Sequence, residues 1–381
     1  MTSFEAFSAQ IRAIPANFPC YKVRRENAPK PACKEKTMAR RNFSMQAYWE
    51  DQVENFTPKL HFDGQTKDWE SWRQTAHTKY MELLGSFPDP VPLEAEVESS
   101  VEDEGLIRER VVFNSEPFMS VPCQVLRPES MPADGTNAAI LCSHGHGPFG
   151  KDPVAGIRSS DEMSANIEVH NYDYGFQMAK AGFLTISPDL RGFGERRDGR
   201  NPFPGRDPCN VNYIRGTMLD RWPLTLNIWD MKCCIDYLET RSEVDPKRIG
   251  MMGLSQGGTM TTFAAAAEPR IAAADIMGYV NPWKGFAFER VNFCGSQIVP
   301  GIHAWFDTDD IAGLIAPRPL MLDMGMYDDC FFIHDMLKGY EGVKRIYEAA
   351  GAADRLWKLV HPSGHGWGGV EGTAEFFGTY L

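Results

Sequence analysis

A serine bracketed by glycines is the residue whose setting best suits nucleophilic chemistry. Residues 253–257 read Gly-Leu-Ser-Gln-Gly, which fits the pattern Gly-x-Ser-x-Gly. An apolar run leads into this segment, and a stretch rich in alanine and threonine leads out of it. A sharp strand-to-helix turn strains such a serine and exposes its hydroxyl, and side chains at Gly253 or Gly257 would collide with neighbouring elements. We therefore predict Ser255 as a nucleophile; the alternative is a helix N-cap serine.

A serine hydroxyl needs a base that accepts its proton, and a histidine near the C-terminus could provide it. His365 lies between two glycines in the sequence SGHGW, which would let its ring reach back over a sheet. His361 competes for this role, but it ends a predicted strand and we expect it to be structural. A carboxylate should orient the imidazole. We predict that Asp328 does so, with Asp329 and Asp323 as alternatives.

The sequence also offers donors for a tetrahedral oxyanion. One should be the backbone N–H of Gln256, directly after the serine. The other should come from the loop His-Gly-His-Gly at 144–147, where we predict the N–H of His146, with Gly147 as the alternative. Metal binding by the two histidines is disfavoured, because no carboxylate or cysteine cluster lies beside them in the sequence. We therefore predict no metal site.

Strands that alternate with helices must position these residues. An antiparallel strand pair is expected first, and the apolar runs that follow it are typical of buried parallel strands with helices on both faces. In such sheets, sites form at the carboxyl ends of the strands, and every candidate residue directly follows a strand. The predicted strands are 107–114, 121–127, 138–143, 183–187, 248–253, 273–277, 318–324 and 356–361.

The N-terminal part is expected to be an extension, at residues 1–100, with helices that pack on a main domain at 101–381. Residues 68–85 read as an amphipathic helix because aromatic and apolar residues recur at helical spacing. Residues 1–43 should form an irregular arm or short helices and could bridge subunits of a homo-oligomer. The long segment 281–308 should form a partial lid, and we predict that Trp283 and Trp305, together with Phe288 and Phe293, line a substrate pocket.

Composition excludes several classes of partner. The chain has 381 residues, 43% hydrophobic, and a formal net charge of −12. Such a charge disfavours nucleic acids and anionic membrane surfaces. We detect no signal peptide and no stretch apolar enough to cross a bilayer. The nine cysteines are scattered without a CxxC pair, so we expect no disulfide framework or zinc site and place the protein in the cytoplasm.

Together, these motifs resemble the dienelactone hydrolase and acetyl xylan esterase-like branch of the α/β-hydrolase superfamily. The resemblance covers most of residues 107–381 and rests on SHGHG at 143–147, PDLRGFGE at 188–195, GLSQGG at 253–258, LIAPRPLMLDMGMYDD at 314–329 and RIYEAAGAADRLWKLVHPSGHGW at 345–367.

This resemblance implies an α/β-hydrolase fold and hydrolysis of small-molecule carboxylic esters, usually with small acyl groups and without a cofactor. The order serine, acid, histidine is the order expected in that fold. The site carried over consists of Ser255, Asp328, His365, Gln256 and His146. One departure concerns residues 329–332, Asp-Cys-Phe-Phe, where the family often has a proline and an apolar pair. It leaves the choice between Asp328 and Asp329 open.

Three other functions fit the same residues. A peptidase could use the same serine, histidine and acid, although the sequence contains no large accessory domain to select peptides. A carbon–carbon bond hydrolase or lyase is also compatible, because one fold hosts different chemistries. A non-catalytic binding protein with a vestigial site is the third, and the intact set of residues argues against it.

Overall fold

The computed structural model describes residues 41–64, 68–197 and 207–381. Residues 44–381 form one compact unit. The predicted irregular arm at 1–43 lies outside the described residues except for its last three positions. The predicted boundary between residues 100 and 101 stays a prediction. Across the described ranges, every helix is too short or too polar to cross a lipid bilayer.

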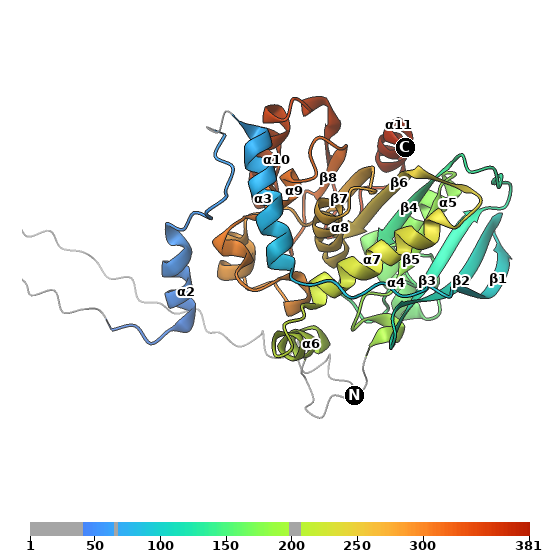
Figure 1. Ribbon diagram of the computed structural model, residues 1–381, viewed down its shortest axis with the longest axis horizontal. Coiled ribbons are helices and arrows are strands. Elements are labelled where there is room, and N and C mark those ends of the chain that lie inside the picture. The colour runs from blue at the N-terminus through green and yellow to red at the C-terminus, as the bar shows by residue number, and fades with distance from the viewer. Residues whose placement is uncertain (1–40, 65–67, 198–206) are drawn as a thin grey trace, which may run out of the picture. The chain divides into compact units, whose positions relative to one another are not determined.

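A nine-stranded sheet forms the centre of the described chain (Figure 1), in the order β1-β2-β3-β5-β4-β6-β7-β8-β9. The first three strands pair antiparallel, and β3 also pairs antiparallel with β5. From β5 to β9 all pairings are parallel. The predicted mostly parallel sheet is therefore confirmed. Its strands are β1 (Glu96–Asp103), β2 (Leu106–Glu116), β3 (Met119–Pro128), β4 (Asn137–Ser143), β5 (Leu184–Pro188), β6 (Val244–Leu254), β7 (Ala273–Met277), β8 (Leu320–Gly325) and β9 (Leu356–His361).

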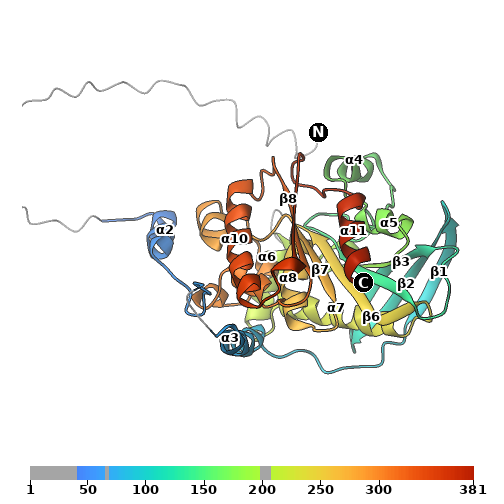
Figure 2. The same ribbon diagram turned by 90° about the horizontal axis from the view of Figure 1, so that it is seen from above.

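Helices cover both faces of this sheet (Figure 2). One face carries α4 (Asp161–His170), α5 (Tyr174–Lys180) and α11 (Val370–Tyr380), and the other carries α3 (Trp69–Leu84), α7 (Pro223–Glu239) and α8 (Gln256–Ala267). Successive residues of β4 contribute to the two opposite hydrophobic cores. A strand buried on both faces is apolar throughout, which is why β4 reads as one apolar run. The remaining helices are α2 (Met45–Glu54), α6 (Pro208–Thr217), α9 (Thr308–Gly313) and α10 (Ile333–Ala349).

The predicted helix at 68–85 is confirmed as α3. The Asp68 side chain caps its N-terminus by accepting a hydrogen bond from the Ser71 N–H, and Gly85 ends it with φ of 73°. Its inner face buries Trp72, Ala76, Tyr80 and Leu84. The hydroxyl of Tyr80 donates a hydrogen bond to the Phe263 carbonyl of α8, at 2.6 Å. The tryptophan stripe thus packs α3 against the sheet-covering helices, as predicted.

The segment predicted as a lid, 281–308, connects β7 to α9 through three short helical turns. These are η3 (Lys284–Glu289), η4 (Gly295–Gln297) and η5 (Ile302–Ala304). Its residues Phe286, Phe293 and Cys294 line a cavity that also reaches Ser255. This segment therefore walls one side of the region where the candidate residues meet.

Candidate active site

Ser255 lies in the sharp turn between β6 and α8, with φ of 63° and ψ of −115°. A non-glycine residue at such angles is strained. The flanking glycines are required by space: a Cβ at Gly257 would lie 2.0 Å from the Ser143 carbonyl oxygen, and one at Gly253 would lie 2.5 Å from the Gly257 oxygen. The expected close approach of these glycines to neighbouring backbone is thus observed. The turn holds the Ser255 side chain at the cavity, above the N-terminus of α8.

His365 contacts Asp328 and not Asp329. The Nδ1–H of His365 donates to Asp328 Oδ2 at 2.8 Å. Asp328 is 5% exposed, and its other oxygen accepts the N–H groups of Cys330 at 2.8 Å and Phe331 at 2.7 Å. Asp329 is exposed. The segment that departs from the family pattern therefore supplies two amides that fix the carboxylate facing His365.

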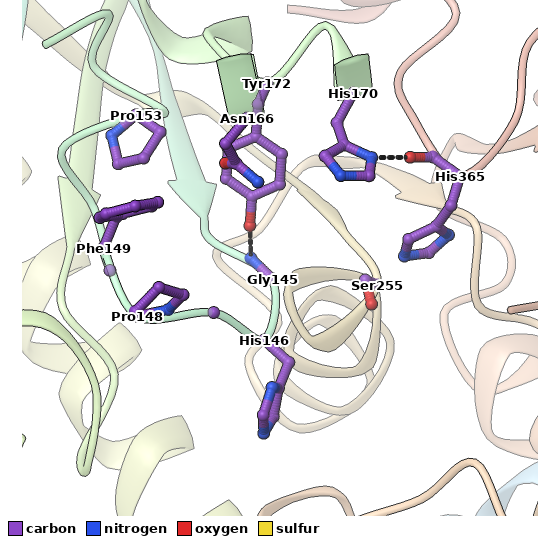
Figure 3. A pocket seen from close by; sticks show the side chains of 12 residues that line it. Gly145, His146, Pro148, Phe149, Pro153, Asn166, His170, Tyr172, Ser255 and His365 are labelled. Carbon is purple, nitrogen blue, oxygen red and sulfur yellow. Dashed lines mark hydrogen bonds between the residues drawn. The ribbon is translucent and has the colours of Figure 1, made fainter. Parts of the chain in front are cut away.

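Phe331 and His170 hold His365 in place through its ring and its backbone. The Phe331 ring stacks on that of His365, with centroids 5.5 Å apart and planes at 21°. His170, at the end of α4, hydrogen-bonds to the His365 carbonyl through Nδ1 (Figure 3). His361, the competing histidine, instead lies 2.6 Å from Asp323 Oδ1 through its Nε2 atom. This buried pair lies within the β8–β9 edge of the sheet and leaves the cavity to His365.

The predicted oxyanion loop follows β4 and turns toward Ser255. The Gly145 N–H donates to the Tyr172 hydroxyl, so this amide is already engaged. His146 and Gly147 line the same small cavity as Ser255, and they remain the two alternatives for one donor. Gln256 begins α8, so its N–H lacks an acceptor within the helix. A helix N-terminus also favours negative charge.

His144 anchors this loop. The ring is fully buried, donates from Nδ1 to the Gly145 carbonyl at 2.7 Å, and accepts the Leu190 N–H at Nε2 at 3.0 Å. Burial lowers the pKa of His144. Both ring nitrogens are therefore used by backbone groups, which makes His144 a structural residue.

Two cavities meet at Ser255 and His365, which line both of them. The smaller, about 60 Å³, is bordered by His170 and Tyr172 on one side and the proline-rich stretch after the oxyanion loop on the other (Figure 3). The larger, about 400 Å³, has aromatic walls and polar groups, and its volume is typical of a small-molecule site. Its aromatic walls are Phe286, Phe293 and Phe331, and its polar groups include Asn292, Gln297 and Asp207.

The two tryptophans predicted to bind substrate lie elsewhere. Trp283 is 1% exposed, packs edge-on against His303, and receives its backbone anchor from Asp307. The ammonium groups of Lys59 and Lys79 both lie over the Trp305 ring, 4.4 and 4.3 Å from its centroid. Neither is among the described residues that line the two cavities. Both tryptophans are therefore packing residues. Trp283 packs within segment 281–308, and Trp305 packs against lysines that precede β1.

Three groups of side chains have the residue types and spacing of metal ligands among the described residues. One contains Asp328 and His365, which already pair with each other. The second joins His61 to Asp310, whose hydrogen bond raises the pKa of His61 to about 9. The third joins His146, Cys209 and Cys294 beside the larger cavity. The Cys209 side chain, assisted by His146 and Ser296, lowers the pKa of Cys294 to about 5.

The sheet order, with the strained strand-to-helix turn at Ser255, is that of the α/β-hydrolase fold. Residues 165–281 match the dienelactone hydrolase family. The chain is 27% identical over 293 residues to the protein named "Putative hydrolase YtaP" from Bacillus subtilis (strain 168), covering 74% of this chain and 90% of that protein. These findings confirm the predicted resemblance.

Solved structures agree on the fold. A protein described as a "putative acetyl xylan esterase" from Bacteroides fragilis NCTC 9343 aligns with a TM-score of 0.68 at 18% identity, covering 84% of this chain and 83% of its own. The glucuronoyl esterase from Solibacter usitatus aligns with a TM-score of 0.61 at 15% identity, covering 81% and 93%. Both likenesses show the fold.

Proposed function

We propose that the protein is a serine-dependent hydrolase of carboxylic esters with small acyl groups, acting through an acyl-enzyme intermediate. The observation that carries this proposal is the position of His365. It pairs with the buried Asp328, and it lines the same two cavities as the strained Ser255. The acid fixes the Nδ1–H tautomer, which leaves Nε2 free to accept a proton. The family match supports the same chemistry.

The reaction would run in two halves. Nε2 of His365 takes the Ser255 proton as the hydroxyl oxygen attacks the ester carbonyl carbon, and the Gln256 N–H with one amide of the 144–147 loop stabilises the oxyanion. The protonated His365 then gives its proton to the leaving alkoxide, so that the alcohol departs and an acyl-serine remains. Water then attacks the carbonyl carbon of the acyl-serine while His365 takes a proton from it. His365 passes this proton to the departing serine oxygen, which releases the carboxylic acid and restores Ser255.

The unequal cavities support the small-acyl preference. A site of about 60 Å³ beside Ser255 admits an acetyl group more readily than a long chain. The larger cavity, about 400 Å³, can take the alcohol part, and its mixture of phenylalanine rings with Asn292 and Gln297 suits an alcohol that carries both a flat apolar face and hydroxyl groups. A sugar satisfies this description, which makes sugar acetates suitable substrates.

Hydrolysis of p-nitrophenyl acetate tests the proposal. The wild-type protein should hydrolyse it, Ser255→Ala should be inactive with an unchanged circular dichroism spectrum, and the remote control Ser99→Ala should match wild type. Activity should fall from the acetate to the octanoate ester, and p-nitroacetanilide should resist cleavage. Wild-type-like turnover by Ser255→Ala would refute the nucleophile. A preference for the octanoate would refute the assignment of the small cavity.

A further inference from the structure

Three potential metal ligands from distant parts of the sequence meet at the wall of the larger cavity. His146 follows β4, Cys209 lies in the first turn of α6, and Cys294 directly precedes η4. One ligand atom from each lies within 4.8 Å of the other two. His146 Nε2 lies 3.4 Å from Cys209 Sγ. The proposed mechanism uses only backbone N–H groups of the 144–147 loop and does not involve Cys209 or Cys294. It therefore assigns no role to the three side chains.

The two segments that carry the thiols are tightly packed against each other. The Gly295 N–H donates to Asn210 Oδ1 at 2.8 Å. A Cβ at Gly295 would lie 2.3 Å from the Tyr213 Cβ, so a glycine is needed for this close approach. Cys209 and Cys294 are 4% and 8% exposed. The sulfur atoms are thus held in fixed positions by α6 and the turn before η4.

A carboxylate lies beside the group. Asp207 caps α6 by accepting the Cys209 N–H at Oδ1, 3.0 Å away. Its other oxygen, Oδ2, lies 3.9 Å from His146 Nε2. In a tetrahedral zinc site with bonds of about 2.0–2.3 Å, neighbouring ligand atoms are separated by roughly 3.3–3.8 Å. The 3.4 Å separation between His146 Nε2 and Cys209 Sγ lies within this range, and the Asp207 oxygen lies just beyond it.

We propose that His146, Cys209 and Cys294 bind a zinc ion, with the Asp207 carboxylate beside them. Imidazole and thiolate groups are the donors that zinc prefers. A tetrahedral ion held by these three side chains would keep its fourth position for a water molecule. The site would join the loop after β4 to α6 and to the lid segment.

The ion would act on the neighbouring oxyanion donors. His146 belongs to the loop proposed to supply one of these donors. The other proposed donor is the backbone N–H of Gln256, and Cys294 Sγ lies 3.8 Å from the side-chain oxygen of that residue. Zinc would therefore fix the position of the loop and of the wall around Gln256. This consequence rests on the proposed function, whereas zinc binding itself can be measured without any ester.

Metal titration of the full chain, reduced with a phosphine and freed of metal, tests the site. Zinc should compete with a chromogenic chelator at one equivalent, and cobalt(II) should give the near-ultraviolet absorption of a thiolate–metal bond. Cys209→Ser and Cys294→Ser should each weaken zinc binding at least about 100-fold. Cys330→Ser is the matched control, because Cys330 lines the same cavity beside Asp328 and His365; it should bind zinc like wild type.

Several results would overturn the proposal. They are the absence of stoichiometric zinc binding, cobalt binding without a thiolate band, or affinity lost in Cys330→Ser but kept in both other variants. Two separate serine variants keep the test valid if one of them fails to fold, which circular dichroism would reveal. Formation of a Cys209–Cys294 disulfide in a protein whose reduced form ignores zinc would assign the pair to redox chemistry and also refute the site.

Discussion

Replacement of Asp328 by asparagine should inactivate the protein without unfolding it, and the hydrogen bonds around this carboxylate explain why. Oδ1 accepts two backbone N–H groups, from Cys330 and Phe331, while Oδ2 accepts the His365 Nδ1–H. In Asp328→Asn, the amide oxygen must stay at the Oδ1 position to keep the two backbone bonds. The NH₂ group then faces His365.

An NH₂ group at this position demands an acceptor at His365 Nδ1. The ring must therefore carry its proton on Nε2, facing Ser255, and cannot accept the serine proton. The opposite orientation of the asparagine would direct its NH₂ group at two backbone donors, each a lost hydrogen bond worth about 1–3 kcal/mol. Loss of the correct tautomer in a serine–histidine–acid site lowers kcat about 10⁴-fold, or roughly 5.5 kcal/mol of transition-state stabilisation.

Steady-state hydrolysis of p-nitrophenyl acetate measures this effect. Asp328→Asn should lose about 10³- to 10⁴-fold in kcat with a modest change in KM, and Asp329→Asn should retain activity because that side chain is exposed. Thermal unfolding monitors the fold of both variants. Activity of Asp328→Asn within tenfold of wild type, or a larger loss in Asp329→Asn, would refute the assignment of the acid.

Three further predictions concern the surroundings of the site. Gly257→Ala should abolish activity and lower the free energy of unfolding by more than about 2 kcal/mol, because its Cβ would lie 2.0 Å from a carbonyl oxygen of β4. An activity assay and denaturant unfolding measure the two effects, and a soluble, active variant would contradict the prediction. Tyr172→Phe should leave the Gly145 N–H without its acceptor and lower kcat more than it changes KM, with about 1–3 kcal/mol of stability lost; unchanged kinetics and melting would show that the oxyanion loop does not depend on this bond. His61, raised to a pKa of about 9 by Asp310, should contribute about 1–2 kcal/mol of stability that is complete below about pH 6.5 and lost as pH rises through about 9. Melting curves at pH 6 and pH 10 should show a smaller difference for His61→Gln than for wild type, and equal differences would exclude the pair as the cause.

The sequence predicts the elements that carry the candidate triad because their patterns are local. β7 and β9 begin and end at the predicted residues. Ser255, Asp328 and His365 follow the parallel strands β6, β8 and β9, so all three lie at the carboxyl edge of the sheet. The choice between Asp328 and Asp329 was open in the sequence because both follow β8. Burial and the two amide bonds, which depend on how the loop closes, distinguish them.

The supporting residues were not predictable in the same way. Tyr172 and His170 contact the oxyanion loop and the His365 loop, but neither lies in a recognisable motif, and their roles depend on where α4 ends. β1 was also missed, because its polar sequence is exposed along nearly its whole length. The apolar patterns used to find strands report burial, so an exposed edge strand escapes them.

The lid region and the cysteines show a second limit. Trp283 and Trp305 suggested a pocket because large aromatic residues often line one, yet their partners come from η5 and from the N-terminal segment. The sequence argued against metal binding at His146 because cysteines are absent nearby. Cys209 and Cys294 reach it only through the packing of α6 on η4, which no sequence spacing encodes.

Labelling with a fluorophosphonate probe, followed by peptide mass spectrometry, tests the central claim most directly. Such probes react with a serine whose hydroxyl is activated by a histidine and faced by oxyanion donors. One equivalent should attach to Ser255, with complete loss of p-nitrophenyl acetate hydrolysis, and His365→Ala should label far more slowly. A folded protein that remains unlabelled, or that carries the adduct on another residue while Ser255 stays free, would contradict the account.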